Sequence, residues 1–217
     1  MISDVLVVAP HPDDETLSCG GTLLKLKDSG CQLHWLIVTC MNEAPRVSRD
    51  KEIESVAKAF GFDSVSCWEI TTTTVDTMPF GELVCKASNI LAELKPSTLL
   101  LPFCNDVHTD HYYTSKAFLS CCKWFRHPYI THVLFYETIS ETDFNINPTD
   151  TPFLPNIYVD ISQYFHKKME ILNIYKSELG DFPFPRSPEA IESLARLRGS
   201  QCGAEYAEVL CLLRSVF

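Results

Sequence analysis

The chain has 217 residues, of which 46% are hydrophobic and 21% charged, and its formal net charge is −10 at pH 7. This composition excludes a disordered chain and suits one globular domain covering residues 1–217. The acidic charge makes nucleic acid and anionic membranes poor partners, and no apolar run approaches the ~18–20 residues needed for a transmembrane segment.

Strand-like and helix-like segments alternate along the first two thirds of the chain. The pattern predicts strands at residues 5–9, 33–39, 64–70, 98–102 and 132–136, and helices at 16–27, 49–60, 81–94 and 108–125. Farther along, it predicts a strand at 158–161 and helices at 163–175 and 188–198. This alternation indicates an α/β fold, a Rossmann-like three-layer sandwich with a mainly parallel sheet.

The ten cysteines include no Cys-x-x-Cys pair, so a structural zinc ribbon is not expected. The N-terminal residues lack the basic start of a signal peptide. We therefore expect a cytoplasmic protein whose thiols are reduced, most of them buried in the core, and no disulfide framework.

Two polar clusters follow predicted strands. His-Pro-Asp-Asp-Glu occupies positions 11–15, directly after the first strand, and His-Thr-Asp-His occupies 108–111, shortly after the fourth. Both clusters are expected at the carboxyl edge of the parallel sheet, where α/β proteins bind their ligands. Their shared position predicts one composite site.

Imidazole and carboxylate groups together are a usual ligand set for Zn²⁺, and a catalytic zinc takes three protein ligands. His11 and Asp14 are three residues apart at the entry to a helix, so both side chains can face one point. His108 and His111 share a helix face in the same way. Asp110 points away from that face and is placed to orient a neighbour.

Each cluster alone has a plainer interpretation. The first could be a turn with an aspartate helix cap, and the second a solvated helix start. Their expected position at one edge of the sheet favours a functional site over both. The spacing leaves open whether Asp13 or Asp14 binds the metal.

The run Val-Ala-Pro-His-Pro-Asp-Asp-Glu at 8–15, followed by Cys-Gly-Gly-Thr at 19–22, resembles the opening motif of the LmbE/PIG-L family of N-acetylglucosaminyl deacetylases. The cluster at 108–111 resembles the second motif of that family, His-x-Asp-His. Val38-Thr39, Arg49-x-x-Glu52 and the C-terminal stretch 198–208 are similar to the family pattern, so the resemblance covers nearly the whole chain.

The resemblance implies a zinc-dependent hydrolase that removes the N-acetyl group from an amino sugar or its conjugate. It implies one Zn²⁺ per chain, although the same ligands would accept Fe²⁺ or another divalent metal. The implied ligands are His11, Asp14 and His111, and the implied general base is Asp13. His108 would be the acid or the oxyanion-stabilising partner, in protonated form, and Asp110 the orienting residue.

Three residues, Arg49, Asn105 and Asp106, are predicted to hold sugar hydroxyls or a phosphate. For Arg49 an exposed charge in a first helical turn is an equal alternative. The loop 40–45 lacks the glycine that family members often carry and is expected to shape the pocket. The sugar could be free, nucleotide-linked or lipid-linked, and homo-oligomer formation is open.

Other functions are weighed against this one. An amidase or de-carbamoylase acting on a different acyl group of a modified sugar would use the same site. A binding protein without turnover is disfavoured by the intact set of histidines and aspartates. A dinucleotide enzyme is disfavoured because no Gly-x-Gly-x-x-Gly follows the first strand.

Overall fold

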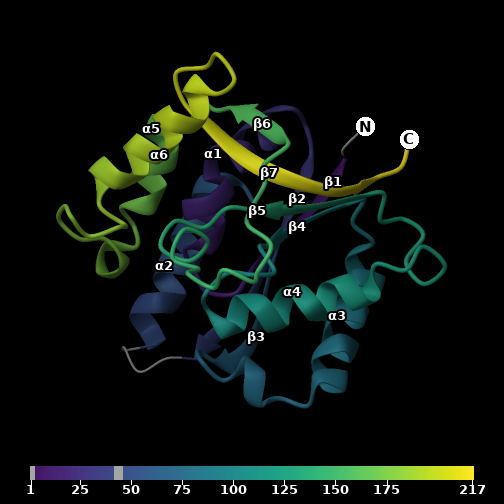
Figure 1. Cartoon of the computed structure of the whole chain (residues 1–217). Helices are drawn as coiled ribbons and strands as arrows, with labels where there is room; N and C mark the ends of the chain where they lie inside the picture. The colour runs from purple at the N-terminus through teal and green to yellow at the C-terminus, as the bar shows by residue number, and fades with distance from the viewer. Residues whose placement is uncertain (1–2, 42–45) are drawn as a thin grey trace.

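The computed structural model describes residues 3–41 and 46–217 (Figure 1). Its described strands form one seven-stranded sheet in the order β3-β2-β1-β4-β5-β7-β6. In chain order they are β1 (Asp4–Ala9), β2 (Gln32–Met41), β3 (Ser64–Thr71), β4 (Thr98–Pro102), β5 (His132–Tyr136), β6 (Ile157–Asp160) and β7 (Ala207–Ser215). The first five run parallel, whereas β7 is antiparallel to both β5 and β6. The predicted mainly parallel sheet is confirmed.

Helices cover both faces of this sheet, as predicted for a three-layer sandwich (Figure 1). One face carries α3 (Phe80–Leu94) and α4 (Thr109–Cys121). The other carries α1 (Asp14–Asp28), α2 (Arg46–Phe60), α5 (Phe165–Leu172) and α6 (Pro188–Ser200). Two short 3₁₀ turns, Val75–Thr77 and Lys176–Glu178, lie in the connections.

Strand β1, which lies between β2 and β4, explains why the fold has two cores. Successive strand residues point to opposite faces, so Val5 and Val7 pack under α1 while Leu6 and Val8 pack under α3 and α4. All four side chains are completely buried. The apolar run at residues 5–9 is continuous because this strand is buried on both faces, as the sequence suggested.

The sheet order brings the two polar clusters together. β1 and β4 are adjacent, with Val5 beside Thr98 and Val7 beside Leu100. The segments that leave their carboxyl ends, residues 10–13 and 103–108, consequently meet at one edge of the sheet.

Two elements differ most from the sequence-based prediction, and helix α5 is also shorter than predicted, covering residues 165–172 instead of 163–175. Strand β7 was not predicted, although residues 207–215 form a largely apolar run of strand length. Helix α4 ends at Cys121 instead of residue 125, and the Cys122 carbonyl, free of the helix, accepts a hydrogen bond from the Arg214 guanidinium of β7. Both differences involve the antiparallel strand that enters the sheet from the end of the chain.

The expectation of reduced, mostly buried thiols is wrong in part. Cys40 of β2 and Cys67 of β3 form a disulfide whose Cα atoms are 6.6 Å apart. Cys85 and Cys202 are exposed. The disulfide joins neighbouring strands near the carboxyl edge of the sheet, where Cys40 also contributes to the pocket described below.

Within the described ranges, none of the helices has the length and apolar character that crossing a bilayer requires.

Candidate metal centre and active-site pocket

Three side chains from the two clusters converge at the edge formed by β1 and β4. His11 follows β1, Asp14 begins α1, and His111 lies in the first turn of α4. Potential ligand atoms of the three lie within 4.8 Å of one another. Asp14 Oδ2 is 3.3 Å from His11 Nδ1 and 3.2 Å from His111 Nε2, so one carboxylate oxygen faces both rings.

Two buried atoms of this group lack a hydrogen-bond partner among the described residues. They are Asp14 Oδ1 and His111 Nε2, and both residues are completely buried. Although His111 Nε2 lies 3.2 Å from Asp14 Oδ2, this contact does not have hydrogen-bond geometry. Since buried polar atoms are nearly always paired, a bound cation would satisfy both, and the residues fit a metal ion.

Without a metal, the two histidines hold protons. Burial lowers the pKa of His11, but its hydrogen bonds to Asp110 and Asp14 outweigh that effect and raise the pKa to about 9. Burial likewise lowers the pKa of His111, and the Asp14 charge and the Asp106 hydrogen bond raise it well above its usual range. The acidic cavity is therefore built to hold positive charge.

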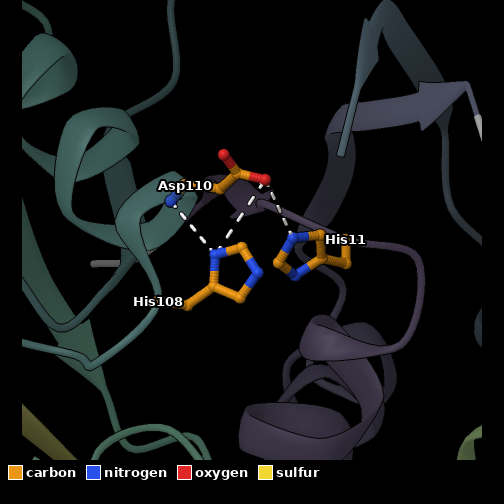
Figure 2. Close-up of side chains that lie close together, drawn as sticks. All are labelled: His11, His108 and Asp110. Carbon is orange, nitrogen blue, oxygen red and sulfur yellow. Dashed lines mark hydrogen bonds and ion pairs between the residues drawn. The ribbon is translucent and has the colours of Figure 1, made fainter. Parts of the chain in front are cut away.

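A second group, His11, His108 and Asp110, also has the spacing of a metal site (Figure 2). In Figure 2 the rings of His11 and His108 lie side by side beneath the Asp110 carboxylate. That carboxylate already accepts the backbone N–H groups of Thr73 at 2.7 Å and Val75 at 3.2 Å. Because its oxygens are engaged, Asp110 is better suited to orienting His11, which lies 3.2 Å from it.

His108 begins α4 as its N-cap. Its Nδ1 accepts the backbone N–H of Asp110 at 3.1 Å, which leaves the ring proton on Nε2. Burial and the charges of His11 and His111 lower the pKa of His108 to about 4. The structure thus presents a neutral imidazole with an N–H donor, which differs from the protonated His108 expected from sequence.

Asp13 has an unusual backbone conformation, with φ 136° and ψ −28°. Residues with a Cβ rarely adopt positive φ, and such a conformation costs about 1–3 kcal/mol. Although Asp13 is the N-cap residue of α1, its side chain does not cap the helix. Instead, Asp13 Oδ2 accepts a hydrogen bond from Arg186 Nη1 at 2.8 Å.

Burial and the neighbouring Asp14 charge raise the pKa of Asp13 well above its usual range, and Arg186 opposes this effect. In contrast, burial raises the pKa of Asp14, but the charge of His111 and the hydrogen bond of His11 lower it well below its usual range. The adjacent carboxyls therefore differ: Asp14 stays anionic among the histidines, while Asp13 is the more basic group. The spacing left open whether Asp13 or Asp14 would bind a metal, and this difference favours Asp14.

A pocket of about 200 Å³ opens beside these groups. Its lining combines donors and acceptors: His11, Pro12, Asp13, Thr39, Cys40, Arg49, Thr72, His108, Glu141, Glu178 and Arg186. The pocket is reached from the carboxyl ends of β1 and β2, as in other open α/β folds.

Of the three residues predicted to hold substrate, only Arg49 lines this pocket. It is ion-paired with Glu178 at 2.6 Å and with Glu52 at 3.1 Å, so it is not simply an exposed helix charge. Asn105 donates its side-chain amide to the Thr151 carbonyl.

Asp106 lies behind His111, since its Oδ2 is 2.8 Å from His111 Nδ1. Residues 42–45 of the predicted pocket loop 40–45 lie outside the described residues.

Sequence reasoning did not single out Arg186, Glu141 or Glu178. Arg186 lies between α5 and α6, 173 residues from the Asp13 that it contacts. The Pro-rich run Phe-Pro-Phe-Pro-Arg at 182–186 marks a structured loop, but it carries no signal for this contact. Only the folded chain reveals that these charged residues line the same pocket.

Comparison with known proteins places the fold and the site in context. Residues 6–122 match the model of the PIG-L family, described as GlcNAc-PI de-N-acetylase. A probable N-acetyl-alpha-D-glucosaminyl L-malate deacetylase 2 of Bacillus anthracis is 26% identical over 80% of each chain. The diacetylchitobiose deacetylase of Thermococcus kodakarensis is 20% identical over all of this chain and 85% of its own.

Among solved structures, the conserved protein TT1542 from Thermus thermophilus superimposes with a TM-score of 0.79 at 27% identity. The match covers 100% of this chain and 97% of that protein. The whole sheet and its helices, including the antiparallel end with β7, therefore have a counterpart of known structure.

Proposed function

Because this chain belongs to the PIG-L (GlcNAc-PI de-N-acetylase) family, we propose that it is a metal-dependent hydrolase that removes the N-acetyl group of an amino sugar or its conjugate. Sugar deacetylases among its relatives support the proposal. The observation that carries it is a pair of buried atoms, Asp14 Oδ1 and His111 Nε2, that have no hydrogen-bond partner among the described residues and lie beside a basic Asp13.

We propose Zn²⁺ as the metal, one ion per chain, held by His11, Asp14 and His111. Two imidazoles and one carboxylate form a ligand set that catalytic zinc sites use. The same set accepts Fe²⁺ and other divalent ions, so metal analysis of the purified protein decides the identity. When bound, such an ion lowers the pKa of a coordinated water toward ~7 and polarises the amide carbonyl.

The residues of the chain supply the remaining chemistry. Asp13 accepts the proton of the attacking water, a task for which a raised carboxyl pKa is suited. His108 lines the pocket, and the Nε2–H of its neutral ring donates to the carbonyl oxygen as it becomes negative. Asp13 then returns the proton to the nitrogen, so that the sugar leaves as an amine and the acetyl group as acetate.

The charged side chains that line the pocket are the groups that bind the sugar. Arg49 and Glu178 form one ion pair there, and Arg186 and Glu141 form another. Each pair offers both N–H donors and carboxylate acceptors, which is the chemistry that sugar hydroxyls require. Asp110 keeps its predicted orienting role, now directed at His11. Asn105 and Asp106 have other contacts, and we do not propose them as sugar-binding groups.

The test is acetate and amine release from a panel of N-acetylated sugars. The panel contains N-acetylglucosamine, diacetylchitobiose, and nucleotide-linked and lipid-linked derivatives. Each is assayed with purified, chelator-treated and zinc-restored protein. Activity that disappears on chelation and returns with zinc supports the proposal. Protein of measured metal content that releases no acetate from any sugar contradicts it and turns attention to other acyl groups, including carbamoyl.

The cytoplasmic location, the linkage of the sugar to a nucleotide or lipid, and homo-oligomer formation stay predictions from the sequence.

A further inference from the structure

The conformation of Asp13 requires an explanation beyond the metal centre. It is a non-glycine residue at φ 136°, and its side chain leaves the end of α1 uncapped. An unfavourable backbone conformation persists only where surrounding contacts fix it. Two side chains of the described residues make such contacts, one with the backbone N–H of Asp13 and one with its carboxylate.

The backbone contact comes from Glu15, whose Oε2 accepts the Asp13 N–H at 3.2 Å. Its other oxygen, Oε1, accepts hydrogen bonds from the Thr16 hydroxyl at 2.6 Å and the Tyr175 hydroxyl at 3.2 Å. Glu15 is completely buried. A carboxyl group is costly at such a position, and all three of its contacts hold it against the Asp13 peptide.

The carboxylate contact comes from Arg186, which forms three hydrogen bonds with three different residues. Nη1 donates to Asp13 Oδ2 at 2.8 Å, Nε to Ser140 Oγ at 2.8 Å, and Nη2 to Glu141 Oε1 at 3.1 Å. The contacts with Ser140 and Glu141 therefore fix the orientation of the planar guanidinium that donates to Asp13. Its side chain is 14% exposed, so solvent competes little for these contacts.

We propose that Glu15 and Arg186 are positioning residues that together hold the Asp13 carboxylate in the orientation it needs as general base. Glu15 fixes the backbone of Asp13 and Arg186 fixes one oxygen of its carboxylate. This inference rests on the proposed function, in which Asp13 receives the proton of the attacking water. A displacement of ~1 Å in such a group can cost about 10²-fold in rate.

A double-mutant cycle between Arg186→Met and Asp13→Asn tests the role of Arg186. We expect Arg186→Met to lower kcat ~10²-fold with metal content unchanged, whereas the loss of its contact with the sugar should raise KM separately. In the Asp13→Asn background, the same change should lower kcat by no more than about twofold, because the group it positions is already lost. Arg186→Lys, which can reach one acceptor but not three, should recover part of the loss. Arg196→Met, at an exposed arginine away from the pocket, is the matched control.

Two variants test the role of Glu15. Glu15→Gln retains one oxygen for the Asp13 N–H, and its amide can donate to the Thr16 and Tyr175 hydroxyls, so kcat should stay within about tenfold of the parent. Glu15→Met removes the acceptor and should lose about 10²-fold. Crystal structures of both provide a second measurement: φ of Asp13 should stay positive in Glu15→Gln and leave that region in Glu15→Met.

The outcomes separate this inference from the proposed function. If Asp13→Asn keeps full kcat, the general-base role fails, and the positioning role fails with it. If Asp13→Asn is impaired but Arg186→Met lowers kcat equally in both backgrounds, only the positioning role of Arg186 is overturned. An unchanged Asp13 conformation in folded Glu15→Met overturns the role of Glu15.

Discussion

Asp106 Oδ2 and His111 Nδ1 share a buried hydrogen bond of 2.8 Å, which fixes the ring so that Nε2 faces Asp14. The other oxygen of Asp106 accepts the Thr142 hydroxyl at 2.6 Å. Asp106 is thus held on both sides, as carboxylates behind metal-binding histidines commonly are. Its position in the sequence suggested contact with substrate, but in the fold it supports His111, which we propose as a metal ligand.

Replacement of Asp106 by Ala should therefore weaken metal binding by about 10–100-fold, because His111 loses the acceptor that orients it. Titration of metal into the apoprotein against a chelator of known affinity measures the change. Asn105→Ala is the matched control, since Asn105 is the adjacent residue and its side-chain amide contacts the Thr151 carbonyl instead. Equal affinities in the Asp106 variant and the parent would contradict the supporting role.

Metal binding at pH 7 should release protons and strengthen as the pH rises. Burial lowers the pKa of His11, but Asp110 and Asp14 raise it to about 9, so the metal-free ring is protonated at pH 7. A ligand histidine must be neutral, and the metal therefore displaces that proton. Apparent affinity should increase with pH through about pH 9, the pKa of His11, and His111 adds to this rise because its pKa is also raised, burial being outweighed by the Asp14 charge and the Asp106 hydrogen bond. Calorimetric titration in buffers of different ionisation enthalpy counts the protons, and a heat independent of buffer would contradict this expectation.

The sequence predicted those parts of the fold and site whose signals are local. Strands β1 and β4 are short, continuous apolar runs, and their adjacency places the two polar clusters together. Strand β7 was missed because its place between β5 and β6 depends on pairing between distant segments. Arg186 was missed for the same reason, since its contact with Asp13 spans 173 residues and depends on the shape of a loop.

Glu15 should make the stability of the metal-free protein depend on pH. Burial raises its pKa from 4.5 to about 7, so between these values the folded protein binds a proton that the unfolded chain does not. The free energy of unfolding should then fall as the pH rises through this window. The difference between the two values corresponds to about 3 kcal/mol.

Glu15→Gln cannot titrate and should show a flatter profile between pH 4.5 and 7 in urea unfolding. Glu170→Gln, at an exposed glutamate, should keep the slope of the parent protein. Identical slopes for the parent and Glu15→Gln would show that Glu15 does not carry this proton.

The buried pair Lys168–Glu208 joins α5 to β7, and both residues also hydrogen-bond to the backbone of α1. Lys168 Nζ lies 2.7 Å from Glu208 Oε1, and both side chains are only 4% exposed. Glu208 also accepts the backbone N–H groups of Gly21 at 2.9 Å and Thr22 at 2.7 Å. These contacts fix the middle of α1, the helix whose first turn carries Asp14.

Lys168→Met should therefore destabilise the fold by about 3–5 kcal/mol, because it leaves the Glu208 charge buried without its partner. Lys167→Met is the control: Lys167 is the adjacent residue, but its side chain is 53% exposed and pairs with Glu170 at the surface. An exposed pair contributes about 0–1 kcal/mol, so this variant should unfold close to the parent. Urea unfolding of both variants measures the difference. Equal losses would indicate that the Lys168–Glu208 pair is not needed to hold β7 against α1.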